Sequence, residues 1–354
     1  KLILHRASMR RYAQEVLWPN GFEVEYLECG SDVVTDTALV RAAFDGATEI
    51  FVFDPLDDRL WKRLEAAAQA LEVHVPLKKL ENPNFYLKQK DVDKLFGSSS
   101  PSFVEFYQYM RERFDVLIDK DYKPFGGKLM YEHEEQKRIP AGEELPGMTT
   151  YGDNEYVREA TTYVELKYSA NPGRSDTFFW PTNKAEASAW LKDFFEHRLP
   201  RYGEFNQVID DRGVWLFHAA LSPLMNSGFL SSKEVVEATL DFSARAKKEI
   251  PLESLEGFIR QVLGAREYAR AVYVTRGTTL ASKNAMGNTR HLTRDWYEAT
   301  TNIEPLDTCI KKVLDFGYLH HAERSAVVGN LMLLSDIHPQ DVYKWFMSMC
   351  IDAY

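Results

Sequence analysis

Helical periodicity runs almost without interruption from residue 184 to the end of the chain. Apolar residues recur there every three or four positions, a spacing that predicts amphipathic helices rather than strands. Ser231 ahead of Glu234, and His338 ahead of Pro339, are typical helix starts. We therefore predict an all-α domain over residues 181–354. Its helices are expected at 184–197, with Thr182 or Asn183 as N-cap, and at 213–226, 231–247, 252–275, 305–317, 318–335 and 338–353.

The first 79 residues have a different pattern, which predicts an α/β domain. Short apolar or alternating segments at 22–27, 49–53 and 72–76 predict strands, and helical spacing at 2–17, 37–44 and 59–71 predicts the helices between them. Strands separated by helices at this spacing indicate a Rossmann-like parallel sheet. Neither a GxGxxG sequence nor a P-loop accompanies it, so this part carries no nucleotide-binding signature. Residues 80–180 form a polar connector with short helices such as 102–114.

The overall charge and the cysteines limit the classes of function. A net charge of −10 argues against binding of nucleic acid by bulk attraction. Cys29, Cys309 and Cys350 are far apart, which argues against a disulfide framework and predicts a reducing, cytoplasmic location. No apolar run approaches the roughly 20 residues that span a bilayer, so we expect no membrane association.

Basic residues nevertheless concentrate in one part of this acidic chain. Between residues 258 and 294, Glu267 is the only acidic residue. The segment forms either a solvated helix face or a surface that meets phosphates. Its basic residues are Arg260, Arg266, Arg270, Arg276, Lys283, Arg290 and Arg294.

Two helix-like stretches, 216–232 and 256–270, combine apolar periodicity with small and polar residues. This combination predicts a floor on which a flat, polar ligand could lie. Glu256 and Arg260 are four residues apart and can pair, and Gly264 leaves room for close approach by a ligand. An ordinary solvated helix with salt bridges remains the alternative.

His320 and His321 are adjacent, so on a helix their side chains point about 100° apart and form a poor metal pair. Either of them could donate a proton beside a conjugated cofactor, or could be a structural residue. No nucleophile elbow, HExxH motif or Ser/His/Asp arrangement is present, so a conventional hydrolase has little support.

Several motifs, in order, resemble the photolyase/cryptochrome superfamily, in its prokaryotic deoxyribodipyrimidine photolyase-related branch, which includes bacterial (6-4) photolyases. The resemblance covers nearly the whole chain. The matching segments are LSPLMNSGFLS at 221–231, EGFIRQVLGAREY at 256–268, GYLHH at 317–321 with Arg324, Gly329 and Asn330, FWPT at 179–182, HRL at 197–199, GGK at 126–128 and IDAY at 351–354.

The resemblance implies an antenna-type α/β domain followed by a helical domain that holds a U-shaped FAD. Light-excited reduced flavin would pass an electron to a pyrimidine lesion in UV-damaged DNA, most closely a (6-4) lesion, while His321, with His320 beside it, protonates the lesion. An antenna chromophore of lumazine type and a monomeric protein are expected. The implied cofactor-binding residues are His218, Leu221, Ser222, Asn226, Arg260, Gln261, Gly264, Arg266, Asn330 and Asp352. The implied DNA-binding residues are Arg270, Lys283, Arg290 and Arg324, and the implied electron relay is Tyr297, Trp345 and Tyr354.

Some positions depart from the branch. Pro305 stands where a cysteine ligand of an iron–sulfur cluster is usual, and Cys309 follows one turn later, so we expect no cluster and no other metal. Ala265 replaces a tryptophan, and Phe346 replaces a tyrosine, which alters the surface beside the flavin and the relay. The chain starts at Lys1 and stops at Tyr354, which suggests a fragment lacking both ends of the family's sequence, so its retention of FAD is open. A cryptochrome-like blue-light receptor without repair activity and a flavin-free homologue remain alternatives.

Overall fold

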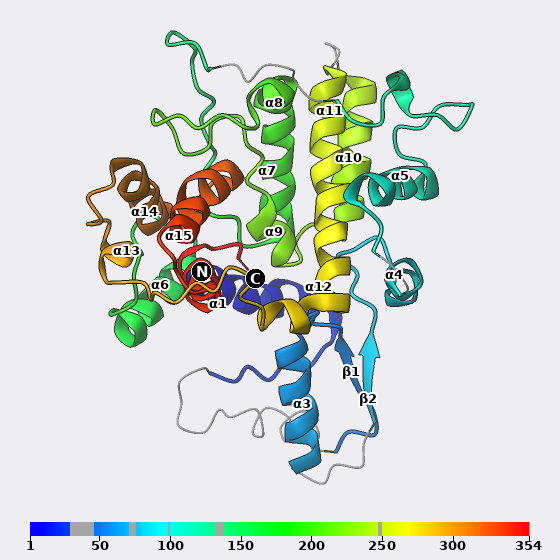
Figure 1. Ribbon diagram of the computed structural model, residues 1–354. Helices are drawn as coiled ribbons and strands as arrows, with labels where there is room; N and C mark the ends of the chain where they lie inside the picture. The colour runs from blue at the N-terminus through cyan, green and yellow to red at the C-terminus, as the bar shows by residue number, and fades with distance from the viewer. Residues whose placement is uncertain (29–45, 71–75, 98–99, 132–137, 247–249, 354) are drawn as a thin grey trace.

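The computed structural model describes residues 1–28, 46–70, 76–97, 100–131, 138–246 and 250–353. Figure 1 shows a large helical body with a small α/β unit, α3 with β1 and β2, below it. None of the helices in these ranges is long and apolar enough to cross a membrane.

The α/β unit has the predicted strand–helix–strand order. Strand β1 (Ile50–Phe53) is followed by α3 (Asp58–Ala70) and by β2 (Leu77–Leu80). The strands are parallel, and Ile50 is opposite Leu77. Because a parallel pair needs a crossover connection, α3 has to lie between the two strands in the chain.

Other predictions for the first 79 residues are wrong or lie outside the described residues. Residues 22–27 are predicted as a strand, but the structure has an irregular segment there, with no ladder partner among the described residues. Strand β2 begins at Leu77, and most of the strand predicted at 72–76 lies in residues 71–75, outside the described ranges. The same holds for the predicted helix 37–44 and for Cys29.

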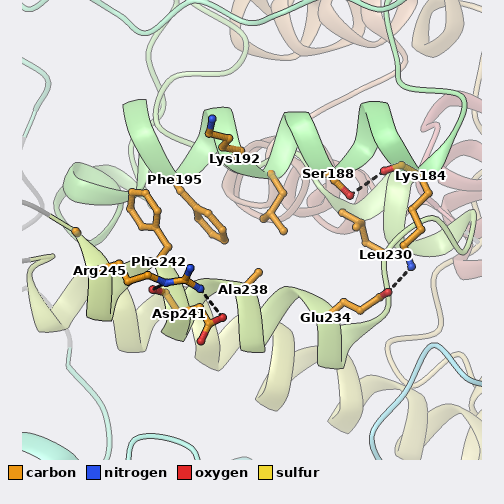
Figure 2. Close-up of a pocket in the computed structure, with 12 residues that line it drawn as sticks. Lys184, Ser188, Lys192, Phe195, Leu230, Glu234, Ala238, Asp241, Phe242 and Arg245 are labelled. Carbon is orange, nitrogen blue, oxygen red and sulfur yellow. Dashed lines mark hydrogen bonds and ion pairs between the residues drawn. The ribbon is translucent and has the colours of Figure 1, made fainter.

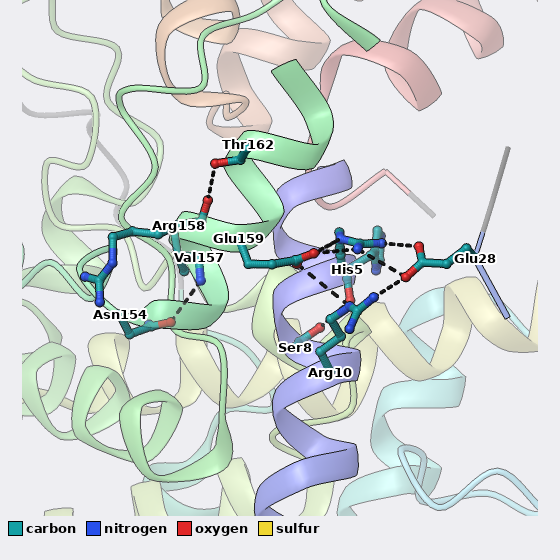
Figure 3. A network of polar contacts seen from close by, with 10 residues as sticks. His5, Ser8, Arg10, Glu28, Asn154, Val157, Arg158, Glu159 and Thr162 are labelled. Atoms are coloured by element: carbon teal, nitrogen blue, oxygen red, sulfur yellow. Dashed lines mark hydrogen bonds and ion pairs between the residues drawn. The ribbon is translucent and has the colours of Figure 1, made fainter. Parts of the chain in front are cut away.

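The first helix packs against the connector. Helix α1 (Leu2–Tyr12), which continues as η1 (Ala13–Leu17) and η2 (Trp18–Asn20), buries apolar side chains against α6 (Glu155–Tyr168). A polar network joins the same elements and extends to Glu28 (Figure 3). In it Arg6 binds Glu28 at 2.6 Å and Glu159 at 2.5 Å, and Arg10 contacts both carboxylates.

The connector contains more regular helix than its sequence suggests. Besides α6 it holds α4 (Gln89–Phe96), α5 (Phe103–Phe114) and the short η3 (Phe125–Gly127). Helix α5 starts where predicted, because the Ser102 side chain accepts the N–H of Glu105.

The helical body follows most of the predicted helices, and three predicted caps are confirmed. The side chains of Asn183, Ser231 and His338 each accept a backbone N–H in the first turn of the helix that follows. The helices are α7 (Lys184–His197), α8 (Leu199–Phe205), α9 (Ser222–Asn226), α10 (Ser232–Arg245), α11 (Leu252–Ile259), η4 (Arg260–Ala265), α12 (Arg266–Ala281), α13 (Asp295–Glu298), α14 (Glu304–Phe316), η5 (Glu323–Gly329), α15 (Asn330–Leu334) and α16 (Pro339–Met349).

Two predicted helices are shorter than expected, and both differences shape the site. The helix predicted at 213–226 is limited to α9, because Leu216 and Ala220 adopt φ of 45° and 48°, the left-handed region that breaks a helix. The helix predicted at 318–335 starts only after His320, since Gly317 ends α14 with φ of 65°. Irregular backbone therefore carries both His218 and His320.

Candidate functional site

Three histidines from two distant segments meet in the helical body. The rings of His218 and His320 are stacked with centroids 3.4 Å apart and an angle of 15° between their planes. The ring of His321 lies 4.2 Å from that of His320, centroid to centroid. Nε2 of His321 is 3.3 Å from Oε1 of Gln207. The sequence predicts each of these histidines as a site residue but does not predict that they touch.

Burial disfavours the charged form of these rings and leaves two of them short of hydrogen-bond partners. His218 and His320 are each 4% exposed. Nε2 of His218 and both ring nitrogens of His320 have no well-formed hydrogen bond within the described ranges. Burial lowers the pKa of His218 to about 3. The pKa of His320 is lowered further, by burial and by the other two histidines, with the Asn206 backbone acting in the opposite direction.

His321 is the exposed member of the cluster. Partial burial of its ring, and to a lesser degree the positive charge of Arg324, lowers its pKa below the ordinary value. Once protonated, this imidazole is therefore a stronger acid than a free histidine.

A chain of polar contacts beside the cluster joins three predicted cofactor residues. Nη1 of Arg266 donates to Oδ1 of Asn226 at 2.6 Å, and Nδ2 of Asn226 donates to the carbonyl oxygen of Asp352 at 2.8 Å. The Asp352 carboxylate forms an ion pair with Arg324, 2.6 Å between Oδ1 and Nη2. Arg324 also donates from Nε to the carbonyl of Leu319, at 2.8 Å. The guanidinium of Arg324 is thus engaged by groups of the protein, and its contact with DNA stays a prediction.

The predicted pair of Glu256 and Arg260 is confirmed, but it faces the connector. Oε1 of Glu256 lies 3.6 Å from Nε of Arg260. Both side chains also bind the backbone of Tyr131: its N–H donates to Glu256 at 2.8 Å, and its carbonyl accepts from Arg260 at 3.3 Å. Burial raises the pKa of the fully buried Glu256.

Gly264 also faces the connector. A Cβ atom at this position would lie 2.9 Å from the ring of Tyr107 and 3.2 Å from that of Phe103. The room that the sequence assigns to a ligand is therefore filled by two rings of α5, and that reason for placing Gly264 in the site was wrong.

The basic stretch divides into buried and exposed parts. Arg266 and Arg270 both lie over the ring of Phe85, 4.9 and 5.0 Å from its centroid. Arg270 is 5% exposed and donates to the carbonyl of Leu87 at 2.6 Å, a position that does not favour contact with DNA; its role there stays a prediction. Lys283 and Arg290, by contrast, are exposed, as are Arg276 and Arg294.

The remaining predicted cofactor residues are less close to one another. Leu221 is part of the hydrophobic core. Ser222, at the first position of α9, and Gln261 and Asn330 are exposed.

The predicted relay residues lie in a second apolar cluster that surrounds α14 and α16. Tyr297 is half-buried, and Trp345 is fully buried with its Nε1 donating to the carbonyl of Trp296 at 2.8 Å. Tyr354 is outside the described residues. Cys309 is buried in the same cluster, and burial raises the pKa of its thiol to about 12. No group of three or more metal-binding side chains occurs in the described part of the chain.

Two hollows lie outside the histidine cluster. One, of about 990 Å³, lies where β1 and β2 end and is closed by α12 and α16, with Trp61, Tyr268, Tyr273 and Tyr343 among its walls. The other, of about 530 Å³, is a groove between α7 and α10 (Figure 2). Its apolar base has ion-paired residues at the rim. The charged residues that line the first hollow are Asp54, Asp57, Asp58 and Glu81, with Arg59 and Lys79.

A family model described as deoxyribodipyrimidine photo-lyase-related protein matches residues 1–180. The chain is 27% identical to a (6-4) photolyase of Agrobacterium fabrum over 357 residues, which cover 98% of this chain and 68% of that protein. It is 32% identical over 113 residues to an uncharacterized protein of Acanthamoeba polyphaga mimivirus, covering 32% of this chain and 85% of that one.

Solved structures show the same fold. A bacterial class III photolyase from Agrobacterium tumefaciens matches with a TM-score of 0.61 and 16% identity, over 99% of this chain and 67% of that one. A cryptochrome of Synechocystis sp. PCC6803 matches with a TM-score of 0.56 and 15% identity, over 90% and 62%. The chain thus has a photolyase-like fold and spans about two thirds of the length of these relatives.

Proposed function

Because this chain belongs to the deoxyribodipyrimidine photo-lyase-related protein family, we propose that it acts as an FAD-dependent, light-driven DNA repair enzyme whose substrates are (6-4) lesions. The observation that carries this proposal is the histidine cluster. Buried imidazole nitrogens without a hydrogen-bond partner, such as Nε2 of His218, are costly in a folded protein, so a polar ligand that meets them is the simplest reason for their presence.

The residues around the cluster fit FAD. His218, Asn226, Arg266 and Asp352 would hold it, since Nε2 of the buried His218 has no hydrogen-bond partner in the described ranges and the other three form a linked set of donors and acceptors. When bound, reduced and excited by light, FAD would supply the electron that the lesion needs. For Leu221, Ser222, Arg260, Gln261, Gly264 and Asn330, a role in cofactor binding stays a prediction.

The chain's own task in the reaction would be to hold and deliver a proton. His321 is the exposed ring, and its lowered pKa makes the protonated form a good donor to a lesion placed outside the duplex. His320, neutral and stacked on His218, would give the ring of His321 a firm backing.

Exposed cations of the basic stretch would meet the DNA. Lys283 and Arg290 are exposed near the ends of the segment that joins α12 to α13, where they can bind phosphates without desolvation. A monomer is sufficient for this task, and a cytoplasmic location is proposed with it.

The hollow at the ends of β1 and β2 would suit the antenna chromophore. In α/β folds, ligands bind at the carboxyl ends of parallel strands. The aromatic walls favour a flat ring system. Four carboxylates against two basic side chains favour an uncharged chromophore such as a lumazine over a phosphorylated one.

For the second apolar cluster we propose electron transfer but no iron–sulfur cluster. Tyr297 and Trp345 could pass electrons toward the flavin, with Tyr354 as the third member. Pro305 stands at the position where a cysteine ligand of an iron–sulfur cluster is usual, and Cys309 is buried in the apolar cluster, so we propose that no iron–sulfur cluster is bound.

A blue-light receptor without repair activity is the second candidate, because a cryptochrome has the same fold and because Arg270 and Arg324 are both bound by groups of the protein itself. Two measurements decide. The absorption spectrum of the purified protein should contain flavin bands; a flavin-free protein would contradict both functions.

Illumination with reduced flavin should then restore (6-4) DNA, and His321→Ala should abolish repair while flavin remains bound. The exposed His197→Ala is the control and should repair normally. Equal repair by the His321→Ala variant would refute the role of His321, and intact lesions with wild-type protein would favour the receptor.

A further inference from the structure

A buried ion pair lies next to residues 318–321, which carry His320 and His321 and are called the histidine turn below. Nζ of Lys312, on α14, is 2.7 Å from Oε1 of Glu323 at the start of η5, and the two side chains are 11% and 5% exposed. The other carboxylate oxygen of Glu323 accepts the backbone N–H of His320 at 3.3 Å. One carboxylate therefore contacts both the ammonium group and the main chain that carries the histidines.

The ammonium group also reaches the loop opposite the histidine turn. Nζ of Lys312 lies 3.4 Å from the carbonyl oxygen of Asp210 and 3.5 Å from that of Gly213. This loop begins just after Gln207, the contact of His321, and continues to His218. Lys312 and Glu323 thus connect the segments that carry all three histidines and their glutamine.

Net stability is a poor explanation for this pair. Transfer of two charged groups from water into a protein costs a hydration free energy that their mutual attraction only roughly offsets. An apolar pair of similar volume would fill the same space. It could not accept the N–H of His320 or donate to two carbonyls, so the ion pair contributes a defined orientation of the backbone segments that it contacts.

The other charges around the rings are already balanced. The cations that face the three imidazoles are Lys312, Arg198 and Arg324. Arg198 is paired with Asp193, and Arg324 with Asp352. Of the three carboxylate partners, Glu323 is the one that also binds the backbone of the histidine turn.

We propose that Lys312 and Glu323 are positioning residues, which fix the His320 turn against the Gln207 loop and so set the direction and tautomer of the His321 ring. This inference rests on the proposed function for its purpose, but its geometry can be tested without a lesion or light.

The test uses Lys312→Met and Glu323→Gln in the full chain, with the exposed neighbour Lys311→Met as matched control. Nitrogen-15 NMR of labelled histidines reports the tautomer of each ring in the dark, with and without flavin. We expect the signals of His320 and His321 to move in both variants and to stay in the control. Lys312→Arg, which keeps the charge, should restore most of the original pattern.

Repair supplies the second readout. With flavin content and melting temperature near wild type, the repair rate should fall by about 10- to 100-fold and its pH profile should shift, because a small misplacement of a proton donor is enough for such a loss. A double variant, Lys312→Met with Glu323→Leu, keeps an apolar pair in place and covers the case in which a single variant fails to fold; it should fold and still show the altered histidine signals.

Histidine signals like those of the wild type in Glu323→Gln and in the double variant would overturn the proposal. If wild-type protein does not repair lesions but the signals move as expected, the proposed function fails while the positioning role stands.

Discussion

Replacement of Gly264 by alanine should destabilise the protein, although alanine is the better helix former. In a helix interior the exchange favours the folded state by about 1 kcal/mol. The new Cβ would lie 2.9 Å from Cδ2 of Tyr107 and 3.2 Å from Cζ of Phe103. Tyr107 is fully buried and its ring is stacked on that of Phe103, so neither ring can easily move aside. Such overpacking costs about 1–3 kcal/mol, which leaves a net loss of up to about 2 kcal/mol.

Gly257 provides a matched control in the same continuous helix. A Cβ there would have its nearest neighbours at 3.8 and 3.9 Å, which is ordinary van der Waals contact. Gly257→Ala should therefore stabilise the protein by up to about 1 kcal/mol. Since the chemical change is the same at both positions, opposite signs isolate the contact between Gly264 and α5.

Urea unfolding followed by far-UV circular dichroism measures both changes in the free energy of unfolding. Tyr107→Leu in the Gly264→Ala background should cost less than in the wild type, because it removes the ring that the new methyl group meets. The reasoning is refuted if Gly264→Ala is as stable as Gly257→Ala. If the space at Gly264 belonged to a ligand instead, the alanine would weaken FAD binding and leave the unfolding of flavin-free protein unchanged.

Two further predictions concern charge. The free energy of unfolding should fall as the pH falls from about 6.5 toward 3. Burial lowers the pKa of His218 to about 3 from its ordinary 6.5, so the unfolded chain takes up the proton first. Urea midpoints measured at several pH values should show a shallower fall in His218→Asn, and a pH dependence identical to that of the wild type would contradict the assignment. Lys283→Ala and Arg290→Ala should each weaken binding to duplex DNA and reduce the salt dependence of the affinity by about one unit of slope. Arg270→Ala should lower the stability instead, since Arg270 is bound to the Leu87 carbonyl. Binding isotherms at several salt concentrations test this, and the same slope for wild type, Lys283→Ala and Arg290→Ala would contradict it.

The parts of the fold that sequence predicts well are those with local causes. The starts of α7, α10 and α16 follow from Asn183, Ser231 and His338, because a capping side chain binds an N–H within its own first turn. The breaks at 213–221 and 318–320 have no such signal. Leu216 and Ala220 favour helix by composition, and only the surrounding packing holds their φ positive.

The same contrast between local causes and surrounding packing holds for the candidate site. The sequence indicates His218, His320 and His321 one by one, but the stacking of His218 and His320 depends on two irregular segments that no periodicity predicts. Gln207 and Lys312 have no motif around them. Their contacts arise because a loop and α14 pack on the histidine turn, so only the structure assigns them to the site.

The basic stretch demonstrates why a count of charges cannot locate a binding surface. Arg266 and Arg270 are four residues apart, so both lie on one face of α12, and that face packs on Phe85 and the connector. Lys283 and Arg290 come after the helix has ended, and both are exposed. Basic side chains that look alike in the sequence therefore fall into two groups: some bind the connector, and others are exposed and can bind a phosphate. A composition-based prediction of DNA contacts applies only to the second group.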